Sequence, residues 1–276
     1  MNLKSGTVPA EGGALLAYTL REPDGPPEAR IALIHALAMD RTNWDAVIAA
    51  LPPGYAVLTL DCRGHGASTR GVDTFSVNLF IADLATIMTR IGWDRAIVAG
   101  CSMGGCVAQA FAAAHSDCTD ALLLIDTTAW YGPTAQADWQ GRAERARTAG
   151  LAAMAEFQVD RWFSPAFRDS HAPTVEKVLS VFLANNVEAY GATCEMLGRA
   201  DLRNSASDIK CLTTIIVGRD DYATPVSAAG YLNGAISGSR LRILEDARHF
   251  TPIERPRDIA EALMDLTTTI YRAEST

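Results

Sequence analysis

The residue best placed to do chemistry in this 276-residue chain is Ser102, within Gly100-Cys101-Ser102-Met103-Gly104. A short β-branched apolar run precedes this pattern and an Ala-rich, helix-favouring run follows it. A strand that turns directly into a helix strains the residue at the turn, and its neighbours two positions away must be very small. Gly100 and Gly104 meet this demand, which predicts a nucleophilic serine at the tip of the turn rather than a simple helix N-cap.

A serine hydroxyl becomes a good nucleophile only when a base removes its proton, and histidine does this near neutral pH. After a serine at such a turn, the acid and then the histidine follow along the chain. Of the five histidines, His249 is the one downstream of a plausible acid, so we predict that it is the base. We interpret His35 and His65 as structural loop residues. His115 and His171 are expected at the surface.

A carboxylate must hold the imidazole in the right tautomer. The loop Gly218–Pro225, after a predicted strand, offers Asp220 and Asp221, and we predict Asp221. Asp220 is interpreted as a solvent-facing turn residue, and Asp126, at the end of an earlier strand, stays open as an alternative acid.

Acyl transfer also needs hydrogen-bond donors directed at the developing oxyanion. The backbone N–H of Met103 qualifies because it follows the nucleophile at the start of a helix. The second donor is expected in the loop after His35, and Leu37 is our candidate. No histidine pair has the spacing of metal ligands, so we expect neither a metal nor another cofactor.

Alternating strands and helices must position these residues. The apolar runs predict strands at residues 14–20, 30–35, 55–60, 97–101, 121–125, 213–218 and 240–244. Helices are predicted at 41–51, 77–91, 107–115 and 259–271. This rhythm is typical of a mostly parallel α/β sheet with helices on both faces. Ligands bind beyond the carboxyl ends of such strands, where the loops after His35, Asp61, Ser102 and Asp126 lie.

Between residues 135 and 207 the rhythm changes, and only helices are predicted, at 136–148, 151–163, 173–184 and 187–199. The chain then returns to the same sheet. We therefore expect a core domain of residues 1–134 and 208–276, with a helical lid of residues 135–207 over the strand ends. A separate helical binding domain is the alternative.

Composition narrows the class of protein. The net charge is −8, no basic stretch stands out, and nucleic acid is not an expected partner. No run approaches 18 apolar residues, so no membrane span is expected. The stretch Met1–Glu11 has no apolar core of a signal peptide, and the six cysteines are scattered without a Cys-x-x-Cys pair. We expect a cytoplasmic protein, either monomer or homodimer.

These residues together resemble the α/β-hydrolase superfamily. The matching motifs are His35-Ala36-Leu37, Asp61-x-Arg63-Gly64-His65-Gly66-x-Ser68, Gly100-x-Ser102-Met103-Gly104-Gly105, Gly218-x-x-Asp221-x-x-Thr224-Pro225, and His249 followed by Glu254-Arg255-Pro256. More narrowly, the chain is similar to 3-oxoadipate enol-lactonases. That likeness extends into the predicted lid, at residues 161–168, 189–194 and 201–203. Residues 126–132 depart from it, being bulkier than the segment of that family.

The resemblance implies a serine hydrolase that cleaves a small carboxylic ester or (enol-)lactone through an acyl-enzyme. An acidic lactone needs a cation for its carboxylate, and Arg142, Arg161 and Arg199 are candidates, each with a solvated helix face or a salt bridge as the alternative. Trp130, Tyr131 and Trp162 are further candidates for substrate contact. A C–C bond hydrolase, a perhydrolase or haloperoxidase, and a low-turnover ligand receptor stay open as alternatives.

Overall fold

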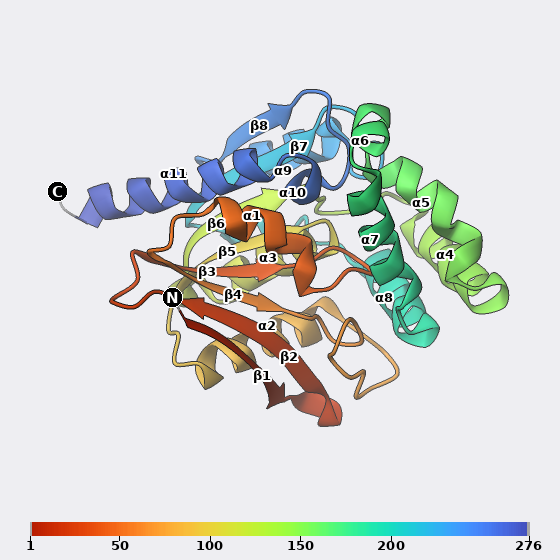
Figure 1. The fold of residues 1–276 in the computed structure, drawn as a ribbon, viewed down its shortest axis with the longest axis horizontal. Helices are drawn as coiled ribbons and strands as arrows, with labels where there is room; N and C mark the ends of the chain where they lie inside the picture. Colours follow the sequence, from red (N-terminus) through yellow and green to blue (C-terminus); the bar gives the residue numbers. More distant parts are fainter. Residues whose placement is uncertain (1, 275–276) are drawn as a thin grey trace.

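Eight strands build one sheet in the computed structural model, which describes residues 2–274 (Figure 1). They are β1 (Asn2–Pro9), β2 (Leu15–Glu22), β3 (Ala29–Ile34), β4 (Tyr55–Leu60), β5 (Ala96–Cys101), β6 (Thr119–Ile125), β7 (Leu212–Gly218) and β8 (Arg240–Leu244). Their order in the sheet is β1-β2-β4-β3-β5-β6-β7-β8. β2 is antiparallel to both of its neighbours, and all other pairs are parallel.

The helices are α1 (Asp45–Ala50), α2 (Val77–Arg90), α3 (Met103–Ala114), α4 (Ala135–Ala149), α5 (Ala155–Trp162), α6 (Pro165–Ser170), α7 (Ala172–Leu183), α8 (Val187–Arg199), α9 (Val226–Ala235), α10 (Thr251–Glu254) and α11 (Pro256–Glu274). Short 3₁₀ helices lie at Glu11–Gly13, Arg41–Trp44, Ser116–Cys118, Leu151–Met154 and Ala206–Asp208. Within residues 2–274, no helix has the length and apolar character needed to span a bilayer.

The central strands are covered on both faces. Every residue of β4 and β5 is buried, and strand side chains alternate between the two faces of a sheet. Burial at every position therefore requires helices on each face, as in other parallel sheets. Two helix pairs supply part of this cover, because α1 packs with α11 and α2 packs with α3. The predicted fold class, a mostly parallel α/β sheet, is confirmed.

Helices α4 to α8, which we call the helical insertion, lie between β6 and β7 in the chain and gather at one end of the sheet (Figure 1). Hydrogen bonds tie them to loops at the carboxyl ends of the strands. The N–H of Phe250 donates to the carbonyl of Trp162 at 3.1 Å. The amide of Asn185 donates to the carbonyl of Ala38 at 2.8 Å.

Four elements differ from the sequence prediction. The edge strand β1 was not predicted because its residues are almost all exposed and so show no apolar run. Helices α6, α9 and α10 were also not predicted. Two of them are only one or two turns long, too short for a helical periodicity to show in the sequence. None of the four changes the position of the residues singled out for chemistry.

Candidate active site

The turn at Ser102 has the strained geometry that its neighbours predicted. Ser102 has φ 55° and ψ −116°, between the end of β5 and the start of α3. A Cβ added at Gly100 would lie 2.0 Å from the carbonyl oxygen of Gly104, and one added at Gly104 would lie 2.1 Å from that of Ile34. Glycine is required at both positions because a side chain would collide with backbone. The turn thus holds the serine hydroxyl at the carboxyl end of the sheet.

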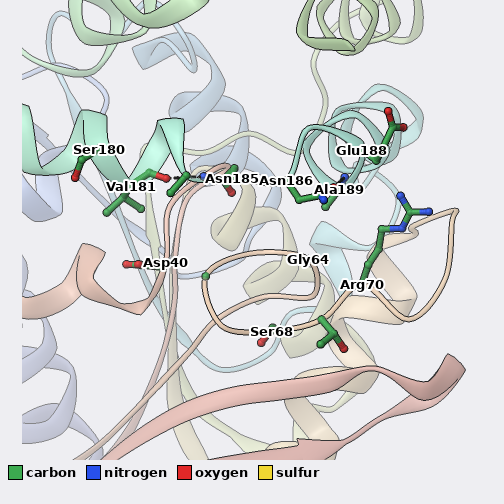
Figure 2. A pocket seen from close by; sticks show the side chains of 13 residues that line it. Asp40, Gly64, Ser68, Arg70, Ser180, Val181, Asn185, Asn186, Glu188 and Ala189 are labelled. Carbon is green, nitrogen blue, oxygen red and sulfur yellow. Dashed lines mark hydrogen bonds between the residues drawn. The ribbon is translucent and has the colours of Figure 1, made fainter. Parts of the chain in front are cut away.

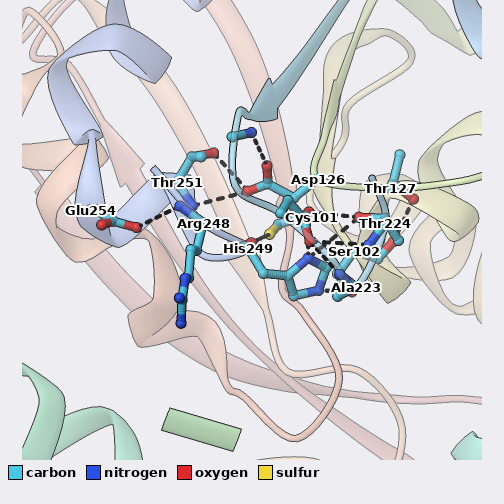
Figure 3. Close-up of polar contacts among 12 residues, drawn as sticks. Cys101, Ser102, Asp126, Thr127, Ala223, Thr224, Arg248, His249, Thr251 and Glu254 are labelled. Atoms are coloured by element: carbon cyan, nitrogen blue, oxygen red, sulfur yellow. Dashed lines mark hydrogen bonds and ion pairs between the residues drawn. The ribbon is translucent and has the colours of Figure 1, made fainter. Parts of the chain in front are cut away.

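Three side chains from distant parts of the chain form one line of hydrogen bonds. The Oγ of Ser102 is 2.9 Å from Nε2 of His249, and Nδ1 of the same ring is 2.8 Å from Oδ2 of Asp221. Figure 3 shows the imidazole of His249 facing Ser102. All three residues are buried. Since an ionised carboxylate only accepts, Nδ1 carries the proton and Nε2 is left to accept from the serine.

Asp221 is held by donors other than the imidazole. The backbone N–H groups of Ala223 and Thr224 donate to Oδ1 at 2.7 and 3.0 Å, and the Thr224 hydroxyl donates to Oδ2 at 2.8 Å. Burial raises the pKa of Asp221, but His249 and these hydrogen bonds outweigh it and hold the pKa below its usual value. The carboxylate therefore stays ionised beside the imidazole. Of the two neighbouring candidates, Asp220 is exposed and Asp221 faces the ring.

Asp126 lies nearby but serves a different set of partners (Figure 3). Its Oδ1 accepts from the N–H of Gly218 at 3.1 Å, and its Oδ2 accepts from the N–H and hydroxyl of Thr251 at 2.9 and 2.7 Å. Burial and the nearby Asp221 charge raise the pKa of Asp126 well above its usual value. Asp126 thus joins the end of β7 to the loop that carries His249, without touching the imidazole.

Hydrogen bonds of the His35 side chain hold the loop after β3 in place. The N–H of Cys62 donates to Nε2 of His35 at 2.8 Å, so the proton of the neutral ring sits on Nδ1, which donates to the carbonyl of Ala36 at 2.7 Å. Burial lowers the pKa of His35 to about 4 and that of the adjacent His65 to about 3, where the neighbouring His35 adds to the effect. Both rings are therefore neutral at pH 7, consistent with structural roles.

A small cavity lies directly over Ser102 and His249, with a free volume of about 20 Å³. This is room for about one water molecule. Besides Ser102 and His249, the cavity is lined by Ala36, Leu37, Tyr131, Trp139, Arg142, Gln158, Arg161, Trp162, Thr224 and Phe250. Met103 is the first residue of α3, where a backbone N–H has no acceptor inside the helix.

The sequence model described as "alpha/beta hydrolase fold" matches residues 30–256, most of the chain. The chain belongs to the alpha/beta hydrolase fold family. The prediction of a hydrolase made from the sequence is thereby confirmed.

Among members of the family, the chain is 30% identical to 3-oxoadipate enol-lactonase 2 of Acinetobacter baylyi, covering 93% of this chain and 94% of that one. The crystal structure of the enol-lactonase from Burkholderia xenovorans LB400 superposes with a TM-score of 0.90 at 30% identity, covering 95% of this chain and all of that one. A thermophilic esterase from Thermogutta terrifontis gives a TM-score of 0.88 at 27% identity, covering 97% and 99%. The resemblance to the enol-lactonases is therefore confirmed.

Two of the predicted arginines reach the cavity of this alpha/beta hydrolase, and neither has a carboxylate partner among the described residues. The Nε of Arg142 donates to the Tyr190 hydroxyl at 2.7 Å, and its guanidinium lies 5.0 Å from the centre of the Trp139 ring. Burial, with Arg142 close by, lowers the pKa of Arg161 to about 10, so it is still charged at pH 7. Two adjacent cations without an anion form a site suited to a carboxylate.

A wider vestibule of about 480 Å³ lies beside the cavity and shares four of its residues. These are Tyr131, Trp139, Arg142 and Arg161. They separate the vestibule from Ser102. The two arginines therefore border both the space over the serine and the space outside it.

Two of the candidate substrate contacts lie outside this cavity. Trp130 does not line the cavity over Ser102, because its ring lies under the guanidinium of Arg203 at 3.7 Å and its backbone pairs with Asp201. Arg199 is exposed and donates to the carbonyl of Phe75 at 3.1 Å, away from the cavity. The adjacent Tyr131 and the buried Trp162 do line it, as expected.

The sequence analysis missed Trp139, Gln158 and Phe250 as lining residues, and Gln158 is the polar one among them. Gln158 of α5 is only 1% exposed and lines the cavity with Ser102 and His249. A glutamine on a short helix gives no sequence signal of this kind, since the residue is a common one on solvent-facing helix surfaces. Arg161 and Trp162 lie one turn further along the same face of the helix, and both were candidates. Their spacing from Gln158 was the signal that could have indicated its place in the cavity.

A larger groove, of about 560 Å³, lies elsewhere, between the loop at Gly64–Arg70 and the junction of α7 and α8 (Figure 2). The polar side chains along its rim have partners in the fold. The Asn186 side chain accepts from the N–H of Ala189 at 2.9 Å, and Glu188 pairs with Arg147 at 3.3 Å. This groove holds none of the residues predicted for catalysis.

Proposed function

We propose that the chain hydrolyses the ester bond of a small lactone or ester that carries a carboxylate, through an acyl-enzyme on Ser102. One observation carries the proposal. The hydrogen-bonded line of Ser102, His249 and Asp221 reaches a cavity that is also lined by two arginines without an anionic partner in residues 2–274. The names of the relatives, enol-lactonases and an esterase, describe the same class of bond.

In the first half-reaction, the Ser102 hydroxyl attacks the carbonyl carbon while Nε2 of His249 takes its proton. The imidazolium that forms is stabilised by the ionised Asp221. The backbone N–H groups of Met103 and Leu37 are the proposed donors to the oxyanion. When the tetrahedral intermediate collapses, the C–O bond to the leaving oxygen breaks and His249 returns the proton to that oxygen.

In the second half-reaction, water attacks the acyl-enzyme and gives a proton to His249, which then passes it to the departing Ser102 oxygen. For a lactone the leaving oxygen stays attached to the acyl chain. The product of a lactone that already carries a carboxylate is therefore a dianion.

We also propose that residues 135–207 act as a lid on a core of residues 1–134 and 208–276. The support is the small free volume over Ser102, about 20 Å³, which is less than a lactone needs. Helices α4 and α5 supply much of the wall that closes it, including Trp139, Arg142, Arg161 and Trp162. A movement of these helices or their side chains admits the substrate from the vestibule.

The test is hydrolysis of 3-oxoadipate enol-lactone and of p-nitrophenyl acetate by the purified chain and by Ser102→Ala. The expected loss in kcat for Ser102→Ala is at least about 10⁴-fold on both substrates, because nucleophile removal eliminates the acyl-enzyme route. Circular dichroism and thermal melting check that the variant is folded. Equal rates for the folded variant and the parent on either substrate contradict the proposal.

A further inference from the structure

One cavity-lining side chain, Gln158, has a buried amide oxygen without a partner among the described residues. Gln158 is 1% exposed, yet its Oε1 atom accepts no hydrogen bond from any residue that the structure describes. The side chain belongs to α5 and lines the cavity with Ser102 and His249. Two other polar side chains of the same lining, those of Thr224 and His249, are both paired with Asp221.

This amide is poorly explained by the stability of the fold. Buried polar atoms in folded proteins are nearly always hydrogen-bonded, and an unpaired one is unfavourable. Leucine or methionine would fill a similar space on α5, with similar helix propensity and no unpaired atom. A glutamine whose acceptor is left open inside a substrate cavity instead suits a donor that arrives with the substrate.

We propose that Gln158 forms a hydrogen-bonding subsite for a hydroxyl group on the carboxylate-bearing part of the substrate. The proposal rests on the proposed function and adds a preference for hydroxylated acids among its esters and lactones. Helix geometry supports it, because Gln158 and Arg161 are three residues apart and both line the cavity. A substrate whose carboxylate meets the arginine pair therefore has its neighbouring carbon atoms beside the amide.

The kinetic test compares two substrates that differ by one hydroxyl. They are monomethyl succinate and the 4-methyl ester of malate, whose hydroxyl lies next to the free carboxylate. In the parent, kcat/KM is expected to be 10- to 100-fold higher for the hydroxylated ester, since a site built for a hydroxyl discriminates against its absence. Gln158→Leu is expected to bring this ratio close to one. Gln140→Leu, the same change at an exposed position of α4, is the matched control and keeps the parent's ratio.

A binding test separates failure of the subsite from failure of the proposed function. Malate and succinate are titrated calorimetrically into Ser102→Ala and into Ser102→Ala/Gln158→Leu. The expected result is tighter binding of malate than of succinate, by about 10-fold, only where Gln158 is present. If both variants prefer malate over succinate to the same extent, the subsite proposal is wrong. That result is expected if an ordered water, and not the substrate, is the partner of the Gln158 amide. If the preference is present but the parent hydrolyses neither ester, the subsite stands and the proposed chemistry falls.

Discussion

The two sides of the cavity over Ser102 differ in how their polar groups are satisfied. On the side of the sheet, Asp221 accepts three hydrogen bonds besides that of the imidazole, and Asp126 accepts three from Gly218 and Thr251. On the side of the helical insertion, the described residues give Arg142 and Arg161 no carboxylate partner and the Oε1 of Gln158 no donor. The two carboxylates of the sheet side have their partners within the fold, whereas these groups of the insertion side are left able to bind a ligand.

This difference indicates a division of labour. Groups that move a proton must be held in one geometry, and fixed hydrogen bonds supply that without any ligand. Groups that recognise a substrate gain most when their partners arrive with it, because an interaction already made inside the protein contributes nothing to binding. We therefore expect changes to Ser102, His249 or Asp221 to lower kcat for every substrate, and changes on the insertion side to alter the choice among substrates.

The largest expected effect separates the two buried aspartates of the sheet side. Asp221→Asn removes the acceptor that fixes the His249 tautomer, and kcat is expected to fall by roughly 10⁴-fold. Asp126→Asn leaves the imidazole contacts intact, so kcat at low temperature is expected within about 10-fold of the parent. Instead, one donor from Thr251 or Gly218 loses its acceptor, which costs roughly 1–3 kcal/mol of stability. Steady-state rates and thermal melting of both variants give the comparison.

If Asp126→Asn loses as much activity as Asp221→Asn while still folded at the assay temperature, the assignment of the acid is wrong. The two carboxylates then act as one unit, which a double variant would show by losing no more than either single one.

The sheet side could be predicted from the sequence because its constraints are local. Gly100 and Gly104 are dictated by collisions with backbone, and that requirement is visible in a five-residue pattern. Order along the chain then placed Asp221 and His249 at the ends of the last two strands. The edge strand β1 shows the reverse case, since its exposed residues carry no apolar pattern and only pairing with β2 makes it a strand.

The insertion side could be predicted only in part, because side-chain direction there depends on how helices pack. Trp130 and Tyr131 are neighbours, yet only Tyr131 lines the cavity, since the chain turns at Thr128 and Trp130 faces Arg203 instead. Arg142 and Arg161 come from different helices, and nothing in the sequence shows that the two guanidinium groups are neighbours. Gln158 was missed for the same reason.

A smaller effect is expected when a charge is removed from the insertion side. Arg161→Gln should lower kcat/KM for monomethyl succinate by 10- to 100-fold and leave that for dimethyl succinate within about threefold, because only the first carries a carboxylate. Loss of one of two adjacent cations should not lower the melting temperature. Arg90→Gln, the same change at an exposed position of α2, is the control. An equal loss on both esters would assign Arg161 a role in the chemistry rather than in recognition.

The smallest expected effect is on the pH dependence of stability, and it comes from the uncharged His65 ring on the sheet side. His65 is buried beside His35 at a ring distance of 5.1 Å, and its pKa of about 3 lies far below the ordinary 6.5. The unfolded chain therefore takes up a proton that the folded chain refuses. The contribution of His65 to stability is complete above pH 6.5 and is lost as the pH falls toward 3, by up to about 1.4 kcal/mol per pH unit.

His65→Phe removes this proton linkage while leaving the other titrating groups in place. Urea unfolding at pH 7, 6, 5 and 4.5 is expected to show a shallower fall in the free energy of unfolding for the variant than for the parent. His171→Phe, at an exposed histidine, should keep the parent's slope. Activity at pH 7 should change little, because His65 does not line the cavity. If the free energy of unfolding of His65→Phe falls with pH as steeply as that of the parent, His65 is protonated in the folded protein. The sheet side would then also hold a charge without an anionic partner, as the insertion side does.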